Sequence, residues 1–442
     1  METSAAAAAT SPNNENKNVA SLWRSKRFYI ILLLWLAVCI NYIDRINLSV
    51  AAPSISKEFG WDPGTMGLLF SSFFWTYVIF MVPTGWLIDR WGSRKVYALT
   101  ISVWSAAAML TGAAIGFASL LTARLALGAG EAGTYPAGGK AIRQWFPAKE
   151  RGFVTAFFNS GASAGPAMAS PVIAWLVVAA GWRASFFITG AIGFVWLFFW
   201  LRYYNHPREC GWLPPAEREY LLANTDTRPV AAPAAAGRKG TILRLFLKRT
   251  TWGLLATQGS GTYGTYLFLT WLPSYLVQAK GFALMKAGIF SSVPFLVAFV
   301  VVLFVGRMSD WLLAPDDVAK GRRRNIVIAV TLLSAVVFFT TLIDNEYLIL
   351  ALITVSVTAL SCSTGLNLAL ANDLIGDPAI TGSVFSIVVL GSNIIAQLAP
   401  LVTGYIVKAT GSFESAFFLA GAVLAFGSLM CFTCSRKRIY LD

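Results

Sequence analysis

Charged residues are scarce in this chain: 13% of its 442 residues are Asp, Glu, Lys or Arg, and 56% are hydrophobic. Soluble domains usually contain about 25% charged residues, so this composition excludes an ordinary soluble protein. Apolar runs long enough to cross about 30 Å of hydrocarbon recur along the whole length. We therefore expect a protein that crosses a membrane many times and has lipid as the partner of most of its surface.

Histidine is nearly absent, because His206 is the single one in the sequence. One histidine leaves no H-E-x-x-H zinc motif and no Ser/His/Asp arrangement for nucleophilic catalysis. Of the five cysteines, Cys431 and Cys434 form a C-x-x-C, but no acidic cluster lies nearby. The sequence therefore predicts no enzyme, no metal site and no organic cofactor.

Twelve apolar stretches are predicted to cross the membrane as helices, because backbone polar groups in lipid need internal partners. These spans are about 28–50, 65–88, 96–116, 118–139, 152–177, 183–203, 251–277, 286–308, 325–343, 346–370, 381–407 and 412–434. The longest polar stretch divides them six and six and is rich in proline, as expected of a flexible linker. The predicted divisions are a tail (1–27), six spans (28–203), the linker (204–250), six spans (251–434) and a tail (435–442).

Lysine and arginine outnumber the acids 35 to 21, which gives a formal net charge of +14. The basic clusters follow the even-numbered spans or lie at the termini, whereas the alternate loops carry little positive charge. This distribution follows the positive-inside rule and predicts that both termini are cytoplasmic. The charge therefore reflects membrane topology, and we expect no nucleic-acid partner.

A loop motif lies between the second and third spans, and its residues are Gly85, Leu87, Asp89, Arg90, Gly92, Arg94 and Lys95. A weaker copy lies between the eighth and ninth spans, from Gly306 to Asp310. Glycine lets helices approach closely, and an acid at a helix end can pair with a base, so we interpret both copies as a conformational latch. This motif resembles the loop signature of the major facilitator superfamily, and the resemblance covers about residues 25–436. It implies an all-α fold of two six-helix bundles, a binding site between them and alternating access.

Three further stretches resemble the anion:cation symporter family, which includes bacterial sugar-acid permeases. They are residues 41–49 (NYIDRINLS), 124–132 (RLALGAGEA) and 145–152 (WFPAKERG). The short loop at about 51–64 resembles the bacterial members. The resemblance implies a transporter of organic anions in the bacterial inner membrane.

Four ionisable side chains lie inside the first six spans: Asp44, Arg45, Arg124 and Glu131. A charge at the bilayer centre costs about 2.5–3.5 kcal/mol on insertion scales, so such residues are candidates for function. Arginine can donate two parallel hydrogen bonds to a carboxylate, so we expect Arg45 to anchor the substrate, as in the family. We expect Asp44 and Glu131 to carry protons and Arg124 to be the counter-ion of one of these acids.

Neutral polar residues at similar depth are candidates for binding substrate hydroxyl groups. Tyr42, Tyr77, Gln258 and Asn393 resemble the family's sugar-acid members, and Ser361 and Ser363 are further candidates. The leading hypothesis is a monomeric secondary transporter that imports a sugar acid (a hexonate, hexarate or hexuronate) with protons. Aromatic carboxylates and small dicarboxylates are alternative substrates. A glycine-proline run in the fifth span leaves anion exchange open, and a sensor that does not transport is a further alternative.

Overall fold

The computed structural model describes residue 22 and residues 25–225, 243–313, 322–343, 345–377 and 380–440. Apart from one isolated bridge between Ile375 and Ile439, regular structure in these ranges is helical, which confirms the all-α prediction. The helices are α1 (Phe28–Phe59), α2 (Pro63–Gly112), α3 (Phe117–Glu131), α4 (Thr134–Trp145), α5 (Ala148–Tyr203), α6 (Pro215–Asn224), α8 (Arg249–Gln278), α9 (Leu284–Leu312), α11 (Arg323–Ser334), α12 (Glu346–Leu374), α13 (Thr381–Ala396), α14 (Leu398–Thr410) and α15 (Glu414–Cys434). Two 3₁₀ helices accompany them, η3 (Pro207–Glu209) and η5 (Ala335–Leu342).

Two of the helices are too long for a single crossing of the membrane. The 50 residues of α2 and the 56 of α5 would extend for about 75 and 84 Å at 1.5 Å per residue, whereas the hydrocarbon layer is about 30 Å thick. Gly92 (φ 80°, ψ 157°) interrupts α2, and Gly181 (φ 83°, ψ 160°) interrupts α5. Only glycine adopts these backbone angles readily, so each glycine separates two crossings.

Three predicted spans are broken where the sequence pattern is continuous. α3 ends at Glu131 and α4 begins at Thr134; α11 gives way to the 3₁₀ helix η5 after Ser334; and α13 and α14 are separated at Gln397. Eight helical segments of the described ranges are long and apolar enough to cross a membrane, and α2 and α5 among them each contain two crossings. With α8 and the pair α3 and α4, the described part of the chain supplies the twelve predicted crossings.

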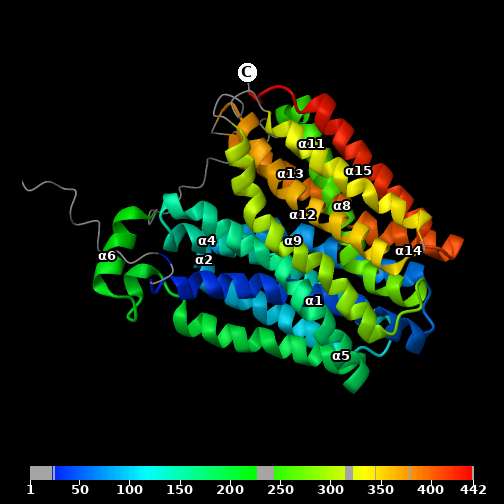
Figure 1. The fold of residues 1–442 in the computed structure, drawn as a ribbon. Helices are drawn as coiled ribbons and strands as arrows, with labels where there is room; N and C mark the ends of the chain where they lie inside the picture. The colour runs from blue at the N-terminus through cyan, green and yellow to red at the C-terminus, as the bar shows by residue number, and fades with distance from the viewer. Residues whose placement is uncertain are drawn as a thin grey trace, which may run out of the picture.

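The twelve crossings form two groups, which Figure 1 shows with α1 to α5 in blue to green and α8 to α15 in green to red. We call these groups the first half and the second half. They meet at the end where α1 finishes and α2 begins: Ser49 donates to the Thr270 carbonyl at 2.6 Å, and a Cβ on Gly67 would lie 2.6 Å from the Pro400 carbonyl. Further contacts join Ser71 with Gln397, Phe70 with Trp271, and Gly288 with Ser170.

The beginning of the predicted linker is packed against the first half, contrary to the expectation of a flexible connection. The Trp212 ring stacks on Trp145 at 5.8 Å, and Leu221 of α6 is fully buried. The Glu217 carboxylate accepts the backbone N–H groups of Lys26 and Arg27 at 3.1 and 3.2 Å. Residues 226–242 of the linker and the tail before residue 22 lie outside the described ranges.

The predicted latch shows some of its expected contacts. Asp89 pairs with Lys140 of α4 at 3.2 Å, and Arg94 donates to the Leu201 carbonyl of α5. Arg90 lies over the Trp86 ring and Lys95 is exposed. Close helix approach at Gly85 is not observed, since no atom lies within 4 Å of a Cβ placed there.

In the second copy of the motif, the side chain of Asp310 lies outside the described part of the structure. Arg323 of α11 pairs with Asp373 of α12 at 2.8 Å and donates to Ser309, the residue of α9 that precedes Asp310 in the sequence, at 3.2 Å. These contacts join three helices of the second half at the same end as the latch residues of the first half.

An ion pair between Asp62 and Lys408 spans the two halves, with 2.9 Å between Oδ2 and Nζ. The hydrogen bond from Lys408, followed by the one from the Thr65 backbone, lowers the pKa of Asp62. Such a carboxyl stabilises the fold fully above its unfolded pKa of about 3.9, and the contribution is lost as the pH falls through the lower folded value.

We predict that Asp62→Asn lowers the midpoint of thermal unfolding near neutral pH, because it keeps a capping side chain and removes the charge. The difference from wild type should shrink below about pH 4, as the wild-type carboxyl becomes protonated. In a Lys408→Gln background, the pH-dependent effect of Asp62→Asn should be smaller, because only contacts with backbone N–H groups, chiefly that of Thr65, then lower the pKa of Asp62. A difference that is the same at every pH would assign the effect to the helix cap instead of the ion pair.

Candidate functional site

A buried ion pair joins α1 to α3 in the first half. Arg45 Nε donates to Glu131 Oε2 at 2.7 Å, and the two side chains are 5% and 0% exposed. Glu131 is the last residue of α3, so its side chain lies at the break that separates α3 from α4. Burying two opposite charges costs solvation free energy, which their mutual attraction offsets only when the contact is short and well aligned. The contact between Arg45 and Glu131 is short.

Aromatic rings surround the guanidinium group of Arg45. The rings of Tyr42, Phe73 and Tyr77 lie 4.8, 4.6 and 5.2 Å from it, which favours a cation at this position. From the second half, the Tyr266 hydroxyl of α8 accepts a hydrogen bond from Arg45 Nη1. Arg45 therefore contacts both halves of the protein at once.

The contacts above leave one donor nitrogen of Arg45 unused. Its Nη2 atom is buried and donates no hydrogen bond to any described residue. The remaining oxygen of Glu131, Oε1, likewise accepts none from the described residues. Buried polar groups normally have partners, so an unused guanidinium nitrogen beside an aromatic wall is a candidate contact for a carboxylate.

Arg124 of α3 has a different environment from the one expected. The ion pair of Glu131 is made with Arg45, and within the described ranges Arg124 has no carboxylate within 4.0 Å. Its guanidinium lies 5.4 Å from the same Phe73 ring that faces Arg45, and its Nε atom is buried without a hydrogen-bond partner among described residues. Among the described residues Arg124 therefore makes no direct ion pair with either acid, and its role as a counter-ion stays a prediction.

Asp44 faces the interior of the first half, as the angle of about 100° between consecutive helix residues allows. It is 2% exposed, and neither of its carboxyl oxygens accepts a hydrogen bond from a described residue. The charge of Glu131 repels its carboxylate and the charge of Arg124 attracts it. A buried carboxylate without a partner costs far more free energy than the neutral protonated acid, so this position suits a group that gains and loses a proton.

In the second half, Gln258 of α8 accepts a hydrogen bond from Asn367 of α12 at 2.9 Å, and both are buried. Asn393 is half-buried and donates to the Val389 carbonyl of its own helix. The polar side chains of Gln258, Asn367 and Asn393 therefore have hydrogen-bond partners within the second half.

The two candidate serines differ from each other in their surroundings. Ser363 is buried and shares a hydrogen bond with Thr331 of α11, so its hydroxyl is used in helix packing. Ser361 is half-buried and donates to the Val357 carbonyl of its own helix.

Sequence reasoning missed Phe73, Tyr266 and Asn367. Tyr266 is one of three tyrosines in α8, with Tyr263 and Tyr275, and the sequence has no feature that selects the one facing Arg45. For Asn367, a signal existed: it lies one helical turn after Ser363, on the same face of α12. Phe73 lies within an aromatic run of α2 whose inward-facing members the sequence does not identify.

Comparison with known proteins adds to this geometry. The profile of the Major Facilitator Superfamily matches residues 34–377. The probable galactarate/D-glucarate transporter GudP of Escherichia coli K12 is 33% identical over 435 residues, which cover 94% of this chain and 95% of that protein. A D-galactonate transporter of Escherichia coli O6:H1 is 32% identical, with 91% of this chain and 94% of that protein covered.

Among solved structures, the fold is similar to that of a bacterial homologue of the human lysosomal transporter Spinster, crystallised in an inward-facing and unoccupied conformation. The TM-score is 0.71 at 18% identity, and 93% of this chain and 97% of the other are covered. At this identity the likeness concerns the fold.

We predict that Glu131→Ala destabilises the protein strongly, because it leaves the charge of Arg45 buried without its carboxylate. Removal of one member of a buried ion pair costs about 3–5 kcal/mol. Glu131→Gln keeps an oxygen for Arg45 Nε and should cost less in the same denaturant titration. The double variant Arg45→Met with Glu131→Leu should recover much of the loss. If the double variant were as unstable as Glu131→Ala, the pair would not be the source of the effect.

Proposed function

This chain belongs to the major facilitator superfamily, and we propose that it imports a sugar acid together with protons by alternating access. The superfamily consists of transporters, so the protein is a membrane transporter and not an enzyme. The observation that carries the proposal is the buried Arg45, which is bonded to Glu131 and Tyr266 and retains an unused donor at Nη2.

The substrate class follows from the chemistry of the site together with the relatives. A carboxylate is the ligand that a spare guanidinium nitrogen recognises best. Tyr42, Tyr77, Gln258 and Asn393 would bind the hydroxyl groups of a polyhydroxylated chain, with Ser361 as a further candidate. Relatives with names that refer to galactarate, D-glucarate and galactonate cover more than nine-tenths of this chain, which supports a hexarate or hexonate.

Coupling to protons would use competition between the substrate and Glu131 for Arg45, because a carboxylate that binds the unused Nη2 and the neighbouring Nε together would take Nε from Glu131. When a substrate carboxylate binds Arg45, the Glu131 carboxylate loses its nearest cation within a buried site. A carboxylate in that situation binds a proton, because the neutral form avoids the cost of an unpaired buried charge. Asp44, already without a partner, would be the second proton carrier, and Arg124 would adjust the charge between the two acids.

Alternating access is supported by where the halves meet. The contacts between Ser49 and Thr270, Gly67 and Pro400, and Asp62 and Lys408 lie at the end where α1 finishes. The positive-inside distribution would place this end at the periplasm and both termini in the cytoplasm of a bacterial cell. The structure would then represent the state that is closed toward the periplasm.

An aromatic carboxylate is the second candidate substrate. The rings of Tyr42, Phe73 and Tyr77 around Arg45 would also flank a planar aromatic acid.

We predict that a hexarate accumulates in proteoliposomes when a pH gradient is imposed, and that Asp44→Asn and Glu131→Gln each abolish this accumulation. The amides cannot release a proton, but they preserve shape, so exchange of internal for external hexarate should continue. Uptake of labelled hexarate measures the first process and counterflow measures the second.

Glu414→Gln, at an exposed acid of α15, is the matched control and should transport as wild type does. Undiminished pH-driven uptake in both Asp44→Asn and Glu131→Gln would contradict the proposed coupling to protons. Uptake of phthalate in place of the hexarate would favour the second candidate substrate.

A further inference from the structure

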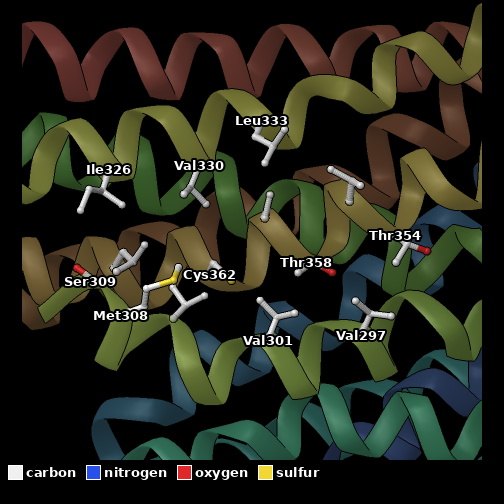
Figure 2. A pocket seen from close by; sticks show the side chains of 14 residues that line it. Val297, Val301, Met308, Ser309, Ile326, Val330, Leu333, Thr354, Thr358 and Cys362 are labelled. Atoms are coloured by element: carbon white, nitrogen blue, oxygen red, sulfur yellow. The ribbon is translucent and has the colours of Figure 1, made fainter. Parts of the chain in front are cut away.

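A groove runs along the second half, away from the charged site. α9 and α11 both pack on α12, and between them lies a cavity of about 300 Å³ with an almost entirely apolar lining. Figure 2 shows Val297 and Val301 of α9 facing Val330 and Leu333 of α11 across this space. The floor is made by α12, whose Ala359, Cys362 and Leu366 are buried.

The groove opens toward the surface that faces the bilayer. Its rim residues are exposed: Val297 is 37%, Met308 52% and Leu333 49% accessible. In a protein that crosses the membrane many times, an apolar and accessible side chain in mid-span contacts lipid. The occupant of this space is therefore drawn from the hydrocarbon layer.

The length of the groove matches one leaflet of the membrane. Its lining on α12 extends from Thr354 to Leu366, and twelve residue steps at 1.5 Å correspond to about 18 Å. Half of the hydrocarbon layer is about 15 Å. On α12, which spans Glu346–Leu374, the lining is centred on the middle of the helix, whereas on α11 it extends from Ile326 to Leu333, close to the start of that helix at Arg323.

Basic residues lie where the groove ends. Arg322 is exposed and precedes the lining residue Ile326 by four positions, so both lie on the same side of the start of α11. Arg323 donates to Ser309, which itself lines the groove, and pairs with Asp373. The apolar channel therefore leads to a positively charged end at the depth of the lipid headgroups.

We propose that this groove binds one acyl chain of an anionic phospholipid, with the phosphate group held at Arg322. The groove supplies an apolar surface for the acyl chain. The arginine supplies the charge that distinguishes an anionic from a zwitterionic headgroup. The site is separate from the transport site and does not depend on the proposed substrate.

The test is native mass spectrometry of the delipidated full chain, titrated with phosphatidylglycerol or phosphatidylcholine of equal chain length. Wild type should retain one phosphatidylglycerol in preference to phosphatidylcholine. Val301→Phe and Val330→Phe, which place a ring in the groove from opposite walls, should each weaken this retention about ten-fold. Ala425→Phe, at an exposed alanine of α15 outside the groove, is the matched control and should retain the lipid.

Charge is tested separately. Arg322→Gln should remove the preference for phosphatidylglycerol, whereas Arg436→Gln, at an exposed arginine after α15, should leave it unchanged. Melting temperatures of all variants establish that they are folded. Equal retention in the groove variants and in Ala425→Phe would overturn the proposal. So would equal retention of both lipids by wild type, or a second copy of the chain bound in place of lipid.

Discussion

The bond between Arg45 and Glu131 is the interaction on which the arrangement of this protein depends. Two charges are buried together in the middle of a membrane protein, where each alone would be costly. Glu131 ends α3, and Tyr266 reaches Arg45 from the other half, so a break in one helix and a contact between the halves meet at the same guanidinium group. A ligand that displaces either partner therefore acts on both halves.

The site takes its charged side chains from the first half and neutral polar side chains from the second half. The first half holds both proton-binding candidates together with both arginines, so its charge can stay balanced as a proton or a carboxylate enters. The second half contributes hydrogen-bonding groups such as Tyr266, Gln258 and Asn367, which can exchange partners without leaving a charge unpaired. A movement of the halves would then change hydrogen bonds and not the net charge of the site.

Much of this could be predicted from the sequence, because hydrophobic length and rare buried charges are strong signals. The twelve crossings, the helical class and the buried positions of Asp44, Arg45, Arg124 and Glu131 follow from them. The partner of Glu131 could not be predicted from the sequence. Helix spacing places Arg124 and Glu131 on one face but says nothing of Arg45, which lies on another helix. Breaks such as the one after Glu131 depend on packing with other helices, which periodicity does not contain.

The most direct measurement of the central claim is the number of protons taken up when a hexarate binds. Isothermal titration near neutral pH, repeated in buffers of different ionisation enthalpy, measures that number. If the substrate carboxylate takes the place of Glu131 on Arg45, wild type should take up protons on binding, and Glu131→Gln should take up one proton fewer. Hexarate binding with no proton uptake in wild type would contradict the account.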